Sequence, residues 1–300
     1  MKILFTFPGQ GGQRPGMLAM IPDREAILTQ ARAVLGDEVD TLDSADALQH
    51  TRAVQLCLLI AGVAWARELQ RQGVDPQMVS GLSIGAFPAA VIAGALDFAS
   101  ALRLVALRGD LMEQAYPEGY GLTAIMGLTR PRVEALMQGH EVYLANLNAE
   151  TQFVIAGRDE AMAEVAQLAL RAGASKAQRL AVSVPSHCAL LDKPAAELAK
   201  AFAGASLSRP RCAYLSGSTA RVLWDPQRIA DDLAMNMARP VHWQEAMVAA
   251  DERDARLAIE MPPGGVLTCL TRQAGWRGET IALERSGLDV ARHLAQRLSD

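Results

Sequence analysis

The sequence predicts an α/β protein with a parallel-sheet core and a small inserted domain. Strands alternate with long helices at both ends of the chain. Residues 119–182 between them hold four short strands and two helices in the order β-α-β-β-α-β, which is the ferredoxin-like plan. Half of the 300 residues are hydrophobic and 21% are charged, which is ample apolar material for a core.

The first part of the core begins with a strand and continues in long helices. Residues 1–7 form an apolar strand that ends at a glycine-containing loop. Residues 46–72 carry apolar side chains at helical spacing and predict a helix. Residues 78–81 predict the end of a buried strand, and residues 84–93 are small and apolar, as in a buried helix. Asp97 can cap the helix that follows.

The rest of the chain divides into the insertion and a second part of the core. In the insertion we expect strands at 121–127, 142–146, 152–156 and 177–184, with helices at 130–138 and 159–172. Beyond it we expect a helix over 188–202, a strand near Ala213, helices around Ile229 and Gln244, a strand over 256–260 and a helix after Gly265. The predicted core is residues 1–118 and 183–300, and the predicted insertion is residues 119–182.

Composition and charge argue against several classes of protein. The longest apolar run, 56–66, is too short to cross a bilayer, and Pro8 comes too soon for a signal peptide. The net charge of −4 and the lack of a basic stripe argue against a nucleic-acid binder. The four cysteines are far apart, which indicates neither a metal site nor a disulfide framework. We expect a cytoplasmic protein without membrane or nucleic-acid partners.

A candidate nucleophile lies in Gly81-Leu82-Ser83-Ile84-Gly85, which has the pattern G-x-S-x-G. In this pattern a strand turns sharply into a helix, and the glycines relieve crowding beside the serine. The hydroxyl then lies near the helix N-terminus, where the Ile84 N–H and the helix dipole can stabilise an oxyanion. The alternative is a small residue in an ordinary tight turn. The apolar strand before Ser83 and the helix after it favour the nucleophile.

A serine nucleophile needs a base, and His187 is the candidate among the five histidines. It follows Pro185-Ser186 where a predicted strand meets a predicted helix, and such junctions commonly carry catalytic groups. The other four lie in polar or helical stretches: His50, His140, His242 and His293. The alternative for His187 is a residue that only caps the helix.

Five separated motifs occur in order along the chain. They are Phe7-Pro8-Gly9-Gln10-Gly11-Gly12-Gln13, the serine motif at Ser83, Arg108-Gly109, Pro185-Ser186-His187-Cys188-Ala189-Leu190 and Pro263-Gly264-Gly265-Val266-Leu267-Thr268. Together they resemble the motifs of the malonyl-CoA:acyl-carrier-protein transacylases, from the first strand to about Arg272. The resemblance implies a hydrolase-like α/β core with a ferredoxin-like insertion, which agrees with the periodicity.

The resemblance also implies roles for six residues. They are Ser83 as nucleophile, His187 as general acid and base, Gln10 and the N–H of Ile84 as oxyanion hole, Arg108 as ligand of the malonyl carboxylate, and Asn236 as the backbone carbonyl that orients the histidine. A planar guanidinium suits bidentate carboxylate binding. The alternatives are an exposed helix arginine at 108 and a Gln10 that only ties its loop to the core. The implied substrate is malonyl-CoA, a coenzyme A thioester, with no tightly bound cofactor. The implied partner is an acyl carrier protein with a phosphopantetheine-type arm.

Three residues depart from the family pattern. The transacylases of fatty-acid synthesis usually carry G-H-S-x-G-E, whereas this chain has Leu82 and Ala86, and Asn236 stands where glutamine is usual. The last change matters little if only the carbonyl acts. The serine motif, the Pro262-Pro263 pair and the chain length are similar to the epsilon subunit of malonate decarboxylase, which implies a carrier with a phosphoribosyl-dephospho-CoA arm and other subunits of that system as partners. The alternative is the transacylase of fatty-acid or polyketide synthesis.

Two other classes of function compete with malonyl transfer. A serine esterase or thioesterase shares G-x-S-x-G, but it needs an acid to orient the histidine. Asp110 and Asp159 lie between Ser83 and His187 without a recognisable strand-end setting. A non-catalytic scaffold subunit has no use for the complete set of serine, histidine, arginine and glutamine. We therefore predict a malonyltransferase that acts as the epsilon subunit of malonate decarboxylase, with the transacylase of fatty-acid or polyketide synthesis as the alternative.

Overall fold

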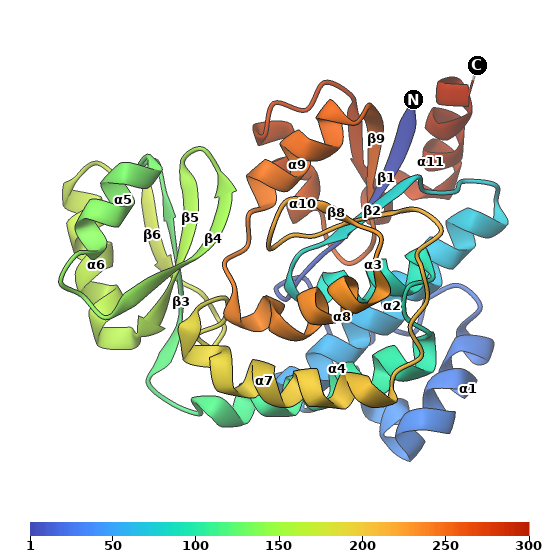
Figure 1. Cartoon of the computed structure of the whole chain (residues 1–300), viewed down its shortest axis with the longest axis horizontal. Coiled ribbons are helices and arrows are strands. Elements are labelled where there is room, and N and C mark those ends of the chain that lie inside the picture. Colours follow the sequence, from blue (N-terminus) through green and yellow to red (C-terminus); the bar gives the residue numbers. More distant parts are fainter. Residues whose placement is uncertain (300) are drawn as a thin grey trace.

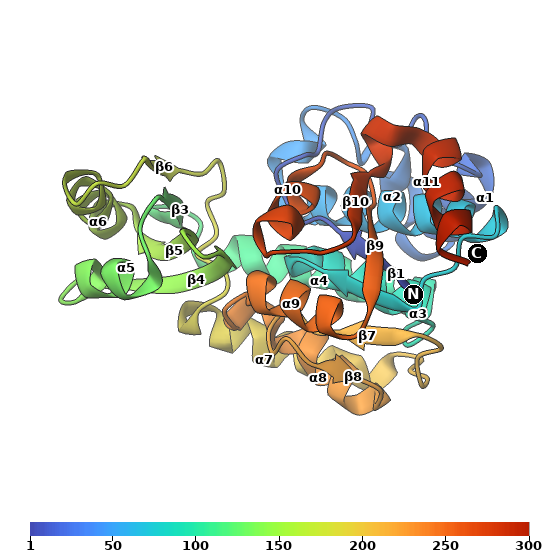
Figure 2. The same cartoon turned by 90° about the horizontal axis from the view of Figure 1, so that it is seen from above.

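Two separate sheets organise the molecule (Figure 1). The computed structural model describes residues 1–299. A six-stranded sheet lies at the centre of the larger part, and a four-stranded sheet lies beside it with its own pair of helices (Figure 2). This arrangement confirms the predicted fold class.

The larger sheet is parallel except at one edge. In spatial order its strands are β10 (Glu279–Ala282), β9 (Ala255–Glu260), β1 (Lys2–Phe7), β2 (Met78–Gly81), β7 (Ala213–Leu215) and β8 (Val222–Leu223). Only β8 runs antiparallel, against β7. Because β1 and β2 are parallel neighbours, with Phe7 opposite Gly81, the loop after β1 and the turn after β2 meet at the carboxyl ends of these strands.

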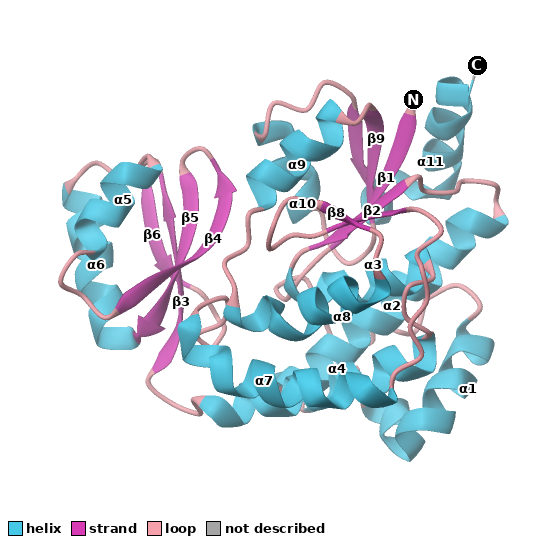
Figure 3. Ribbon diagram, viewed as in Figure 1, coloured by secondary structure: helices cyan, strands magenta, loops and turns pink. Residues whose placement is uncertain are grey.

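Helices cover both faces of this sheet (Figure 3). They are α1 (Arg24–Leu35), α2 (Thr51–Arg71), α3 (Ala86–Ala93), α4 (Phe98–Ala115), α7 (Asp192–Ala201), α8 (Pro226–Met235), α9 (Trp243–Glu252), α10 (Val266–Gln273) and α11 (Leu283–Ser299). Successive side chains of a strand point to opposite faces. Phe5 and Phe7 of β1 accordingly pack in the apolar layer that includes α2, α3 and α11, whereas Leu4 packs with α9 and α10.

The smaller sheet has the ferredoxin-like order. Its strands are β4 (Val142–Ala149), β5 (Gln152–Arg158), β3 (Tyr120–Met126) and β6 (Lys176–Arg179), and all neighbours are antiparallel. The helices α5 (Arg130–Met137) and α6 (Asp159–Arg171) complete its apolar layer. These elements lie within the predicted insertion, and the exact division at 119–182 stays a prediction.

Backbone hydrogen bonds join the smaller sheet to the core. The Leu147 N–H donates to the Val241 carbonyl, and the Val241 N–H donates to the Ala145 carbonyl, both at 2.8 Å. The segment before α9 therefore runs beside β4 as a short extension of its sheet. The segment that leads from α8 to α9 is thus tied to the smaller sheet.

The strand predicted over 177–184 is shorter in the structure. β6 ends at Arg179, whose guanidinium donates to the carbonyls of Tyr120, Leu180 and Val182. Side-chain donors thus replace a strand neighbour for the Leu180 and Val182 carbonyls. The arginine holds together the two segments that cross between the sheets.

One helix also begins later than predicted, while one cap agrees with the prediction. The helix predicted over 46–72 begins at Thr51, because the backbone of His50 is extended with φ −109° and ψ 135°. The Asp97 side chain accepts a hydrogen bond from the Ser100 N–H at 2.9 Å and so caps α4 as predicted.

Neither a membrane span nor a metal cluster is found in the described chain. Among residues 1–299, no helix is both long and apolar enough to cross a bilayer. Within the same residues, no group of three or more His, Cys, Asp or Glu side chains could hold a metal ion.

Candidate active site

Ser83 lies where β2 turns into α3. β2 ends at Gly81, Ser83 has a positive φ of 57°, and a 3₁₀ turn of residues Ser83–Gly85 leads into the helix. A Cβ atom on Gly81 would overlap the backbone of Gly85, and one on Gly85 would overlap the Phe7 carbonyl. Both glycines are therefore required, because the turn passes so close to its own strand and to β1.

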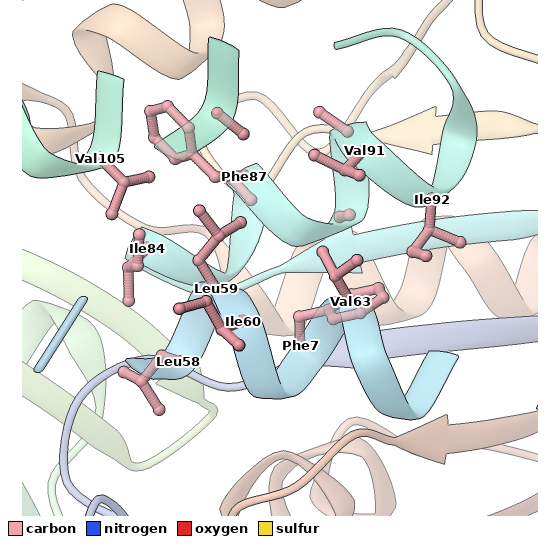
Figure 4. Close-up of a cluster of buried hydrophobic side chains, with 14 of the residues drawn as sticks. Phe7, Leu58, Leu59, Ile60, Val63, Ile84, Phe87, Val91, Ile92 and Val105 are labelled. Carbon is pink, nitrogen blue, oxygen red and sulfur yellow. The ribbon is translucent and has the colours of Figure 1, made fainter. Parts of the chain in front are cut away.

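Apolar packing holds the turn from beneath. Ile84 and Phe87 are fully buried and lie beside Leu59 of α2, with Phe7 of β1 in the same cluster (Figure 4). Ser83 itself is only half-buried. The packing therefore fixes the backbone on either side of a hydroxyl that stays accessible.

His187 contacts Ser83 from a distant part of the chain. Its Nε2 atom lies 2.9 Å from the Ser83 Oγ atom. Its Nδ1 atom lies 2.8 Å from the Asn236 carbonyl and 3.2 Å from the Arg239 carbonyl. Because both of these oxygens can only accept, the ring proton resides on Nδ1, and Nε2 is left to accept the proton of the Ser83 hydroxyl.

The backbone around His187 is also clamped. His187 has a positive φ of 64°, and its N–H donates to the Met237 carbonyl at 2.6 Å. The 3₁₀ turn Asn236–Ala238 thus holds both the ring and the main chain of the histidine. The helix predicted from residue 188 begins as α7 only at Asp192, which leaves His187 in a loop.

The surroundings of His187 keep its ring neutral. The side chain is buried, and burial together with the positive charge of Arg108 lowers the His187 pKa to about 4. The two backbone carbonyls oppose this shift without overcoming it. At neutral pH the ring is therefore unprotonated at Nε2 and can receive the serine proton.

Arg108 of α4 is fully buried beside the same serine. Its Nη1 donates to Gln55 Oε1 and its Nη2 donates to Asn236 Oδ1, both at 2.8 Å. Nη2 also lies 3.3 Å from Ser83 Oγ. Among residues 1–299, no carboxylate pairs with Arg108 and its Nε has no partner. Burial lowers the Arg108 pKa to about 9, so an anion placed here would relieve an electrostatic penalty.

Asn236 acts through its side chain as well as through its carbonyl. Its Nδ2 donates to the Ser83 carbonyl at 3.1 Å, and its Oδ1 accepts from Arg108. The sequence analysis assigned Asn236 an orienting backbone carbonyl and held that the change from glutamine matters little if only that carbonyl acts. The structure shows that the carboxamide also contacts two other residues of the site.

Two glutamines differ in how far the sequence identified them. Gln10 lies half-buried in the loop after β1, beside the pocket formed with Val182 and Val184, and its side chain makes no hydrogen bond within residues 1–299. Gln55 is not predicted, yet it is 1% exposed and bonded to Arg108. The available signal is a single amide immediately before the apolar run of α2.

Neither aspartate weighed for a hydrolase reaches His187. Asp110 accepts from Arg52 at 2.6 Å, and Asp159 accepts from Arg179 at 2.8 Å. Within residues 1–299, the partners of the His187 Nδ1 atom are backbone carbonyls. The site is therefore a serine–histidine pair oriented by main-chain oxygen, with a buried arginine beside it.

Comparison with known proteins places the chain in a family. Residues 4–286 match the family model described as Acyl transferase domain. The chain belongs to this family. A malonyl CoA-acyl carrier protein transacylase from Escherichia coli strain K12 is 37% identical over 285 residues, which cover 91% of this chain and 92% of the relative.

Solved structures agree with this assignment. The crystal structure of an acyl-carrier-protein S-malonyltransferase from Burkholderia pseudomallei has a TM-score of 0.92 at 34% identity and covers 98% of this chain and 100% of that one. A malonyl-transacylase solved with a type II polyketide acyl-carrier protein has a TM-score of 0.91 at 34% identity and covers 98% of this chain and 99% of that one. The chain is an acyltransferase.

In this acyltransferase the two unusual residues of the serine motif are packing residues. Leu82 is half-buried and packs against the apolar layer of α9 and α10. A Cβ atom on Gly9 would lie 2.9 Å from the Cδ2 atom of Leu82, so the loop after β1 lies directly against the Leu82 side chain. Ala86 is buried at the start of α3. Neither departure interrupts the contact between Ser83 and His187.

The depressed pKa of His187 can be measured directly. We expect NMR of labelled histidine to show His187 titrating near pH 4, and we expect Arg108→Ala to raise that pKa because it removes a nearby positive charge. Arg130→Ala, on the exposed surface of the smaller domain, is the matched control and should leave it unchanged. A wild-type pKa near 6.5, or no rise in Arg108→Ala, would contradict this electrostatic account.

Proposed function

We propose that this acyltransferase moves a malonyl group from malonyl-CoA to the thiol of an acyl carrier protein through an ester on Ser83. The observation that carries the proposal is Arg108, a buried cation without an acidic partner 3.3 Å from the Ser83 hydroxyl. A malonyl group has a free carboxylate that can pair with this charge. The names of the relatives reported above supply independent support for malonyl transfer to acyl carrier protein.

In the first half-reaction the enzyme is acylated. Ser83 Oγ attacks the thioester carbonyl while its proton passes to His187 Nε2. The tetrahedral intermediate collapses, the carbon–sulfur bond breaks, and His187 returns the proton to the departing coenzyme A thiolate. The 2.9 Å contact between Ser83 and His187, with Nδ1 fixed on main-chain carbonyls, is the geometry that this proton transfer requires.

In the second half-reaction the carrier takes the malonyl group. His187 removes the proton of the carrier thiol, and the sulfur attacks the ester carbonyl. The bond to Ser83 Oγ then breaks, and the serine recovers its proton from His187. In both halves the developing negative charge would be stabilised by the N–H of Ile84 and by the side chain of Gln10, which lies in the loop beside the serine elbow, the turn of residues 81–85.

The identity of the carrier distinguishes between two hypotheses for malonyl transfer. The relatives reported above support a transacylase of fatty-acid or polyketide synthesis better than a malonate decarboxylase epsilon subunit. The decarboxylase reading, with its other subunits as partners, is supported only by Leu82, Ala86, Pro262-Pro263 and the chain length. We therefore place transfer to a phosphopantetheine-bearing carrier first.

The acyl-serine intermediate is the first test. We expect intact-mass spectrometry after mixing with malonyl-CoA to show one added malonyl group on the peptide that contains Ser83, and we expect none in Ser83→Ala. A hydrolase would release malonate without any carrier, and a scaffold would stay unlabelled. A label on another peptide would exclude Ser83 as the nucleophile.

The same labelled enzyme identifies the carrier. We expect a phosphopantetheine-bearing acyl carrier protein to remove the label and become malonylated. If only a carrier with a phosphoribosyl-dephospho-CoA arm accepts the group, the decarboxylase reading takes precedence over the transacylase.

Arg108 should determine the choice of acyl group. A substrate without a carboxylate leaves the buried charge unpaired at a cost of roughly 2–5 kcal/mol. This corresponds to a malonyl preference of about 30- to several-thousand-fold over acetyl. We expect Arg108→Ala to lose malonyl transfer and to keep or gain acetyl transfer, as measured by the ratio of kcat/KM values. Arg103→Ala, exposed on the same helix, is the control. An unchanged ratio in Arg108→Ala would remove this residue from acyl recognition.

Gln10 should act on rate and not on stability. Losing one oxyanion donor typically slows acylation by about 10²–10³. We expect Gln10→Ala to show this loss in stopped-flow acylation with a nearly unchanged Tm. Gln13 accepts from the Gly11 N–H at 2.6 Å in the same loop, so Gln13→Ala reports the effect of loosening the loop alone. If the Tm of Gln10→Ala falls enough to account for the lost activity, its role is structural.

A further inference from the structure

Asn236 contacts three groups of the proposed mechanism at once. Its carbonyl accepts from His187 Nδ1 at 2.8 Å, its Oδ1 accepts from Arg108 Nη2 at 2.8 Å, and its Nδ2 donates to the Ser83 carbonyl at 3.1 Å. The residue is 5% exposed. Every polar atom of its side chain therefore has a partner within the site.

The partners of the side chain determine its chemistry. The guanidinium of Arg108 can only donate, and the Ser83 carbonyl can only accept, so one orientation of the amide satisfies both. A carboxylate at this position would hold the arginine but would place an acceptor against the Ser83 carbonyl. A hydrocarbon side chain would satisfy neither neighbour.

The neutrality of these contacts matters for Arg108. Asn236 Oδ1 and Gln55 Oε1 hold Nη2 and Nη1 in place without neutralising their charge. A carboxylate in either place would form an internal ion pair in a fully buried setting, where it would compete with an incoming anion.

We propose that the Asn236 carboxamide is a positioning residue that determines acyl specificity, because it aims Arg108 at Ser83 while leaving the charge of the guanidinium free for the substrate carboxylate. The inference rests on the proposed malonyl transfer and goes beyond it. It assigns the side chain of Asn236 a function separate from that of the carbonyl that orients His187. Asn236 contacts Ser83, His187 and Arg108 directly and acts on the substrate through these three residues.

The decisive variant is Asn236→Asp, which keeps the size and the backbone carbonyl but adds a charge. We expect the malonyl-to-acetyl ratio of kcat/KM to fall by about 30-fold or more, mostly through a higher KM for malonyl-CoA, because Arg108 is already paired. Gln273→Glu, exposed at the end of α10, adds the same charge away from the site and should leave the ratio unchanged.

A neutral variant distinguishes the effect of an added charge on acyl specificity from the effect of losing the side-chain hydrogen bonds. Asn236→Leu removes both side-chain hydrogen bonds without neutralising the charge of Arg108. We expect the malonyl-to-acetyl ratio to fall less than in Asn236→Asp, because the guanidinium loses part of its alignment while its charge stays free for the substrate carboxylate. If the malonyl-to-acetyl ratio falls equally in Asn236→Leu and in Asn236→Asp, the carboxamide has a structural role and the proposal is wrong.

A second charged variant controls for a folding defect in Asn236→Asp. Gln55→Glu places a carboxylate on Nη1 of Arg108 and should lower the malonyl-to-acetyl ratio as Asn236→Asp does. The Tm of each variant shows whether it folds. A retained ratio in a folded Asn236→Asp or Gln55→Glu overturns the inference, even when the wild type prefers malonyl. If the wild type forms no malonyl ester on Ser83, the proposed function itself fails.

Discussion

The positive charge of Arg108 is buried where water cannot solvate it and where no carboxylate of the described chain pairs with it. Such a charge persists only if hydrogen bonds hold it in place. Gln55 of α2 and Asn236 beyond α8 supply them through amide oxygens, so two distant segments converge on α4. Burial and this charge together depress the pKa of His187, and the guanidinium faces the Ser83 hydroxyl. The chemistry of the site therefore depends on a cation that the protein positions but does not neutralise.

Strained backbone places the two groups that exchange the proton. Ser83 and His187 both have positive φ angles, 57° and 64°, which side-chain-bearing residues rarely adopt. Neighbouring structure maintains each conformation. The elbow is locked by glycines that touch backbone and by buried side chains of α2 and α3. The histidine loop is held by the carbonyls of Asn236, Met237 and Arg239. Rigid surroundings on both sides keep Oγ and Nε2 at hydrogen-bonding distance.

Main-chain oxygen, and not a carboxylate, orients His187. A carboxylate at Nδ1 would favour the imidazolium and raise the pKa of the ring, whereas a carbonyl fixes the tautomer with a smaller effect on its charge. Burial of the ring, together with the charge of Arg108, lowers the His187 pKa and leaves a neutral ring at physiological pH. Among residues 1–299 no carboxylate lies against Arg108, so the carboxylate of the proposed substrate would meet no competing anion there. The carbonyls that orient His187 are thus compatible with the proposed role of Arg108, because they add no carboxylate that would pair with its charge.

Local patterns were sufficient for the fold class and for the serine elbow. Strand and helix periodicity depends on neighbouring residues, and the glycines at 81 and 85 reflect a steric need within one turn. The position of His187 at a predicted strand–helix junction made it the candidate base, and the resemblance of short motifs added Arg108 and Gln10. The tertiary structure alone decided what the side chains of Gln55 and Asn236 do, since their contacts to Arg108 span 53 and 128 residues of sequence. It also ended β6 at Arg179, whose guanidinium bonds backbone of both crossings between the sheets. Such contacts carry no local periodicity, because they arise only when separate elements pack together.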